Sequence, residues 1–150
     1  MKLSTALLER ADLQRRISEL ATRLNNNAKV QEGEEPAENP TELLTELDGI
    51  FVQLEALIAR INHTNDVTKV NDLSLTDLLA RRDCLKQRMK IMRDFLDSAS
   101  DRATRYSKTE IRIVSTVSVS ELQKEADALA KEWRIIDEKI QALNWTTELV

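Results

Sequence analysis

The chain has 150 residues, a length that suits one domain built around a single hydrophobic core. Hydrophobic residues make up 41% and charged residues 32%, with only 2 glycines and 2 prolines, which favours long amphipathic helices over a turn-rich all-β fold. The net charge of −4 argues against a general nucleic-acid binder, which needs a basic surface. Cys84 is the only cysteine, so no disulfide forms within the chain, and we expect a cytoplasmic protein.

The first predicted helix spans about residues 3–25. Its apolar side chains recur in steps of three and four residues, the spacing that places them on one stripe of a helix. Arg10 occupies one position of that stripe, and Asn25–Asn27 is a typical helix stop. Residues 28–39 contain a glycine, a proline and four glutamates, and we interpret them as an acidic loop. The stripe consists of Leu3, Ala6, Arg10, Leu13, Ile17, Leu20 and Leu24.

The second predicted helix spans about residues 40–62. Asn39 is a suitable N-cap, and Pro40 fits the first helical position, where no backbone donor is needed. The polar run Asn62–Asp66 is expected to end the helix, as part of a linker that reaches Leu73. The seven-residue repeat is unbroken here, in the stripe Leu43, Leu47, Ile50, Leu54, Leu57 and Ile61.

The third predicted helix spans about residues 74–106, with Ser74 as its N-cap. Its stripe contains a second arginine, Arg82, placed seven residues after the first leucine, just as Arg10 is in the first helix. The members of the stripe are Leu75, Leu78, Arg82, Leu85, Met89, Met92, Leu96 and Ala99.

The apolar period then changes from helical to alternating. Residues 110–117 are rich in β-branched side chains at every second position, which predicts a strand. Ser118 is the expected N-cap of a fourth helix over about residues 119–143. The stripe of this helix is Leu122, Ala126, Leu129, Trp133, Ile136, Ile140 and Leu143.

These elements predict a mainly α fold: an antiparallel up-down-up-down four-helix bundle with coiled-coil-like packing, in one domain over residues 1–150. A small β element is expected at one end, where residues 28–31 would pair with the 110–117 strand. The second helix is acidic and the third is basic over residues 81–93, so antiparallel neighbours would face each other with complementary charge.

Arg10 and Arg82 are the main anomaly, because charged side chains at core positions need a partner. In the predicted bundle they fall near one layer, at the end that also holds Asn62 and His63. One interpretation is an anion-binding pocket formed by these four residues. The other is that each helix rotates slightly, Leu7 and Leu79 take the core positions and the arginines extend outward to solvent.

No catalytic residue, metal site or cofactor is predicted. His63 is the only histidine, and an isolated imidazole in a polar helix stop is a poor metal site. Asp94, Asp97 and Asp101 share a helix face, where they either bind a hard cation between chains or form a solvated acidic stripe. The motifs of phosphate-binding loops, Ser-His-Asp hydrolases and di-iron bundles are missing. We therefore lean against an enzyme.

Several segments resemble the septicolysin-like group of small bacterial proteins. They are AKVQEGEEPAENP (28–40), IARINHTN (58–65), YSKTEIRIVSTVSV (106–119), LQKEADALAKE (122–132) and NWTTEL (144–149). His63 departs from the group's pattern, where N-R-T-N is expected. The resemblance implies a mostly helical, cytoplasmic, self-associating protein of uncharacterised function. It offers no catalytic residues, and the group's name implies a cytolysin.

The leading hypothesis is a structural or protein-interaction module that forms a homo-oligomer, a dimer or larger, through the third helix and the 110–117 strand. The alternatives are a cytolysin-like, membrane-active protein and an anion- or metal-binding protein that uses the Arg10/Arg82 end. The first ten residues stop being apolar at Glu9, and no uncharged run approaches 18 residues, so we expect neither an export signal nor a transmembrane segment.

Overall fold

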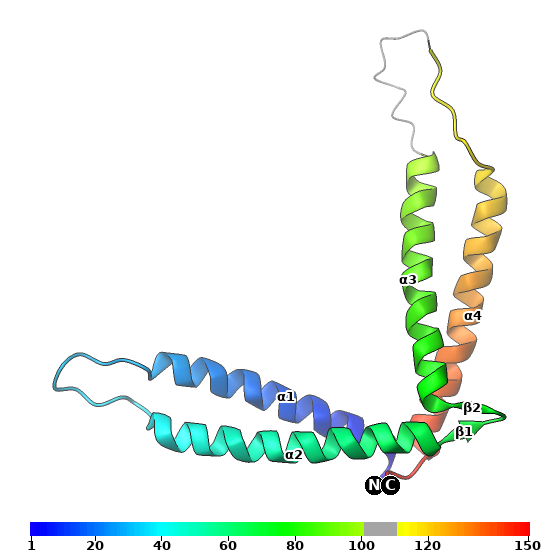
Figure 1. Ribbon diagram of the computed structural model, residues 1–150. Helices are drawn as coiled ribbons and strands as arrows, with labels where there is room; N and C mark the ends of the chain where they lie inside the picture. Colours follow the sequence, from blue (N-terminus) through cyan, green and yellow to red (C-terminus); the bar gives the residue numbers. More distant parts are fainter. Residues whose placement is uncertain (101–110) are drawn as a thin grey trace. The chain divides into compact units, whose positions relative to one another are not determined.

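The computed structural model describes residues 1–100 and 111–150. Most of these residues form four long helices (Figure 1), namely α1 (Leu3–Asn26), α2 (Pro40–Val67), α3 (Leu75–Ser100) and α4 (Val119–Thr146). Two short strands, β1 (Lys69–Val70) and β2 (Leu73–Ser74), pair antiparallel between α2 and α3. The predicted mainly α class with a small β element is confirmed.

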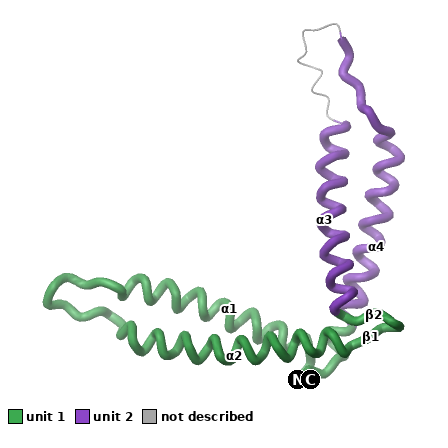
Figure 2. The backbone as a smooth tube through the Cα atoms, viewed as in Figure 1, with its two compact units in different colours: residues 1–75, 143–150 green, residues 76–142 purple. Residues whose placement is uncertain are grey.

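The chain divides into two compact units, which Figure 2 colours separately. The first comprises residues 1–75 and 143–150, and therefore holds α1, α2, both strands and the last turn of α4. The second comprises residues 76–142 and holds most of α3 and α4. Within each unit, two helices run antiparallel and side by side. The single domain over residues 1–150 and the arrangement of four helices around one core stay predictions.

The core of the first unit is the stripe that the seven-residue spacing predicts. Each apolar side chain removed from water there contributes about 1.5–3 kcal/mol relative to full exposure. Leu47 and Ile17 belong to the same stripes but are only half-buried. The buried members are Leu3, Ala6, Leu13 and Leu20 of α1 and Leu43, Ile50, Leu54, Leu57 and Ile61 of α2.

The second unit has a thinner core along the seam between α3 and α4. Met89 and Trp133, which sequence spacing assigns to the core, are half-buried. Two helices on their own shield only one face of each other, so side chains at the edge of the seam stay in contact with water. The buried members are Leu78, Leu85 and Leu96 of α3 and Leu129, Ile136 and Ile140 of α4.

Two predicted helix starts are confirmed. The Asn39 side chain accepts a hydrogen bond of 2.9 Å from the Thr41 N–H at the start of α2, with Pro40 in the first turn. Ser118 Oγ accepts a longer bond, 3.4 Å, from the Glu121 N–H at the start of α4. Each side chain satisfies one of the backbone donors that have no partner within the helix.

The second helix is longer than predicted, because it continues through Asn62 and His63 to Val67. Thr64, in the middle of the supposed linker, is fully buried, and its Oγ1 donates to the Arg60 carbonyl oxygen at 2.8 Å. Thr64 Oγ1 also accepts a hydrogen bond of 3.0 Å from the Val150 N–H. These contacts, made by a residue distant in sequence, outweigh the low helix propensity of the surrounding asparagines.

The predicted strand at residues 110–117 is wrong for 111–117, which form neither strand nor helix; residue 110 lies outside the described part of the chain. Alternating β-branched residues become a strand only when another strand supplies the ladder, and residues 28–31 form none. The observed ladder lies at residues 69–74 instead. It turns at Asn71, whose φ of 55° is a conformation that asparagine tolerates.

Two other helix boundaries differ from expectation. The structure describes α3 as far as Ser100, and the predicted extension over residues 101–106 lies outside the described residues. The fourth helix continues past residue 143 to Thr146. Its last turn belongs to the first unit, so this helix runs from one unit into the other.

The two ends of the chain lie together in the first unit (Figure 1). Lys2 and Glu148 form an antiparallel bridge, in which the Leu3 N–H donates to the Thr147 carbonyl oxygen at 2.9 Å and the Leu149 N–H donates to that of Met1 at 2.8 Å. The Lys2 side chain gives α1 no cap, so the bond to Thr147 satisfies the first helical donor. Lys2 Nζ also lies 2.6 Å from the Glu148 carboxylate.

We expect Leu20→Ala to lower the free energy of unfolding by about 2–5 kcal/mol, because it leaves a cavity in the α1–α2 core. Leu20 is 2% exposed. Leu8, on the same helix, is 69% exposed, and Leu8→Ala is expected to change stability by less than about 0.5 kcal/mol. Urea unfolding followed by circular dichroism measures both. Equal losses in the two variants would contradict the assignment of this core.

Candidate functional site

The four residues of the predicted anion pocket lie in two units. Arg10 is half-buried on α1, and Asn62 and His63 are exposed on α2, all in the first unit. Arg82 is on α3 in the second unit. Within the described part of the chain, no hydrogen bond or ion pair joins any two of these four. The anion pocket stays a prediction.

Arg82 has a carboxylate partner within its own unit. Its Nη1 donates to Asp137 Oδ1 of α4 at 2.9 Å, and the two side chains are only about a quarter exposed. The preceding residue also pairs with α4, because Arg81 Nη2 lies 2.6 Å from Glu132 Oε1. These two pairs fix α3 against α4. The Asp137 carboxylate also supplies the counter-charge that the Arg82 guanidinium needs, and that need was the reason to expect an anion there.

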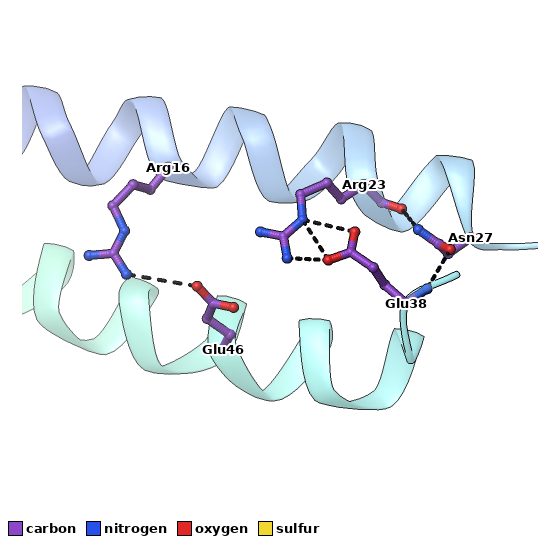
Figure 3. A network of polar contacts seen from close by, with 5 residues as sticks. All are labelled: Arg16, Arg23, Asn27, Glu38 and Glu46. Atoms are coloured by element: carbon purple, nitrogen blue, oxygen red, sulfur yellow. Dashed lines mark hydrogen bonds and ion pairs between the residues drawn. The ribbon is translucent and has the colours of Figure 1, made fainter. Parts of the chain in front are cut away.

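The charged residues of the other unit pair in the same way, from helix to neighbouring helix. Arg16 of α1 lies 3.8 Å from Glu46 of α2. Seven residues further along α1, Arg23 pairs with Glu38, which lies just before α2 (Figure 3). The sequence predicts that the acidic second helix faces the basic third one. The ion pairs across helices in the described residues instead join α1 to α2 and its N-terminal flank, and α3 to α4.

The most elaborate polar cluster ties the loop after α1 to the start of α2 (Figure 3). Arg23 Nε donates to both carboxylate oxygens of Glu38, at 3.0 and 3.2 Å. The Glu38 N–H donates to Asn27 Oδ1 at 3.0 Å, while Asn27 Nδ2 donates to the Arg23 carbonyl oxygen at 2.8 Å. The three residues therefore form a closed ring that caps the end of α1. Sequence inspection missed this ring. It recognised Asn27 only as part of a helix stop, whereas the structure buries this side chain.

The ion pair changes the titration of both partners. The hydrogen bonds from Arg23 lower the pKa of the Glu38 carboxyl below its usual value, and partial desolvation opposes them. The same bonds raise the pKa of Arg23. A second carboxyl, Glu148 at the chain ends, has its pKa lowered by Lys2 and then by the N-terminal ammonium.

Apolar side chains gather on the surface of the second unit, near the end of α3. Ile113 is 68% exposed and Val114 67%. These two residues and Phe95 line an open hollow of about 260 Å³, together with Ala99. Ile91, one turn before Phe95, is 70% exposed. Exposed apolar residues of this size, grouped together, mark surfaces that bind other molecules.

A second apolar surface lies on α2 and was not predicted. Phe51, Leu54 and Ile58 line an open hollow of about 490 Å³ with Ala59, Glu55 and Asn62 at its edges. The signal was present in the sequence, because Leu44, Phe51 and Ile58 recur every seven residues beside the stripe that packs on α1. Asn62, a predicted pocket residue, therefore borders an apolar hollow.

The described residues hold no group of three or more His, Cys, Asp or Glu side chains placed to bind a metal ion. Asp94 pairs with Lys90 at 3.1 Å, and Asp101, in the same predicted acidic row, lies outside the described residues. Within residues 1–100 and 111–150, every helix falls short of the length and apolarity that a membrane crossing requires.

Comparison with known proteins places the chain in a family. Residues 10–149 match the family of unknown function DUF6847, and the protein belongs to that family. It is also similar, at 46% identity and a TM-score of 0.94, to a functionally unknown conserved protein from Corynebacterium diphtheriae whose crystal structure is solved. The match covers 100% of this chain and 99% of that one. No curated protein matches. Neither match supports the septicolysin-like resemblance.

The Arg23–Glu38 pair predicts a pH dependence. Because the pKa of Glu38 is lower in the folded than in the unfolded chain, the pair stabilises the fold above the ordinary carboxyl pKa, and this contribution disappears as the pH falls through the lowered value. We expect Arg23→Gln to return the Glu38 pKa to the ordinary range, as measured by NMR titration of the side-chain carboxyl. Arg15→Gln, which removes a different ion pair from α1, serves as the control. An unchanged Glu38 pKa in Arg23→Gln would rule out this explanation.

Proposed function

We propose that the protein is a structural or protein-interaction module that works by associating with copies of itself. The surface that carries this proposal is the apolar patch of the second unit, formed by Ile91 and Phe95 of α3 with Ile113 and Val114. A patch of this kind costs free energy in water unless another surface covers it. A self-associating protein supplies that cover in every copy.

The chemistry of residues 111–117 supports the same proposal. This segment combines β-branched side chains with backbone that has no strand partner among the described residues. Such a segment pairs readily with another chain, which supplies the missing ladder bonds. Ile111 and Ile113, on one side of the alternation, then pack against the partner. The expected product is a dimer or larger homo-oligomer.

Exposed Cys84 bears on where this module works. A reducing compartment keeps a lone surface thiol free, whereas an oxidising one exposes it to disulfide exchange. A cytoplasmic location is therefore part of the proposal.

Light scattering on the full-length chain tests the proposal. We expect the wild-type protein to show a multiple of the monomer mass and Ile113→Asp to shift the mass towards the monomer, because a buried carboxylate at the interface is costly. Val52→Asp provides a matched control, since Val52 of α2 is 69% exposed and lies outside the patch. A monomeric wild type at every concentration would refute self-association. An oligomeric Ile113→Asp variant would show that this patch is not the interface.

A further inference from the structure

The second helix has an exposed stripe beside the one it buries against α1. Its members follow one another in steps of four and three residues, so they share a helix face. The stripe alternates apolar and acidic side chains and extends about 21 Å from its first residue to its last, at 1.5 Å per residue. It consists of Leu44, Asp48, Phe51, Glu55 and Ile58.

Both parts of this stripe lack a partner. Leu44 and Phe51 are half exposed, and Phe51 and Ile58 line the open apolar hollow of about 490 Å³ on α2. Asp48 and Glu55 are exposed and form no ion pair within residues 1–100 and 111–150. No basic residue occurs between Lys29 and Arg60, so the helix itself does not offset their charge.

The charge pattern excludes one simple occupant, the same stripe of a second copy. Two α2 stripes packed antiparallel about Phe51 place Asp48 of one copy beside Glu55 of the other. Like charges brought together in an interface cost free energy and select against that pairing. The stripe instead fits a helix face that alternates apolar and basic side chains at the same spacing.

Such a face exists on α3. The exposed side chains of α3 at this spacing are Arg81, Cys84, Arg88 and Ile91, and a free cysteine behaves as a small apolar side chain. The spacing of the two arginines equals that of Asp48 and Glu55. Ile91 and Phe95 are exposed, and Arg88 has no ion pair among the described residues. Arg81 binds Glu132 through one nitrogen and retains further donors.

We propose that the acidic-apolar stripe of α2 in one copy docks on the basic-apolar face of α3 in a second copy. The inference rests on the proposed self-association and names its contact surfaces. With the two helices parallel, Asp48 approaches Arg81 and Glu55 approaches Arg88. In the same register Phe51 lies over Cys84 and Ile58 covers Ile91. In a two-fold dimer each copy contributes both faces, so the contact occurs twice.

Charge reversal tests the docking, with the oligomer mass measured by sedimentation velocity over a range of concentrations. The acid variant replaces an acidic residue of α2, Glu55→Arg, and the base variant replaces the facing basic residue of α3, Arg88→Glu. We expect each variant alone to dissociate at a concentration at least about tenfold higher than the wild type. An equimolar mixture of the two variants is expected to recover the wild-type mass, because opposite charges then meet at both contacts.

The matched control is Glu32→Arg, which makes the same change in net charge as the acid variant but in the loop after α1, and it is expected to leave the wild-type association unchanged. Circular dichroism verifies that every variant keeps its helices. A monomeric wild type would refute both this docking and self-association itself. An oligomeric acid variant would refute the docking alone. Weakened variants that fail to recover on mixing would show that α2 and α3 of different copies do not face each other.

Discussion

The structure depends on one constraint: within its unit, each long helix has a single helical neighbour. A helix with one neighbour buries one stripe of its circumference and leaves the rest facing water. The seven-residue spacing of Leu13 and Leu20 on α1, and of Ile50 and Leu57 on α2, supplies that stripe and little more. High charge content follows, because most of each helix surface needs polar side chains.

The same constraint explains where the ion pairs lie. Two helices in contact have two edges along their seam, and long charged side chains can meet across these edges while their aliphatic parts cover the core. Arg23 with Glu38 and Arg82 with Asp137 both occupy such edges. These pairs are partly exposed, so they contribute more to the register of the two helices than to overall stability.

The sequence was sufficient for features governed by local periodicity and capping. The four helices, the buried stripes and the caps at Asn39 and Ser118 all follow from residues within one or two turns of each other. Features that depend on distant residues were not predictable. The hydrogen bond from Val150 to Thr64 supports α2 through residues that favour a helix stop. Residues 111–117 form no strand, because no neighbouring strand in the described part of the chain pairs with them.

The candidate sites show the same division. Arg82 stood out because a charge at a stripe position is a local anomaly, yet its partner Asp137 lies 55 residues away and depends on which helices are neighbours. The exposed stripe through Phe51 was visible as a second register of the same repeat. It was overlooked because a single helix was assigned a single apolar face.

The bridge between the chain ends has a consequence for synthesis on the ribosome. The first donor of α1 is satisfied only by Thr147, and Thr64 of α2 receives its second bond only from Val150. Translation proceeds from the N-terminus, so the unit that begins first is finished last, after the whole of residues 76–142 has emerged. Residues 76–142 are contiguous, so α3 and α4 are free to pack against each other as soon as both have emerged. The unit that contains α1 is completed only when residues 143–150 follow.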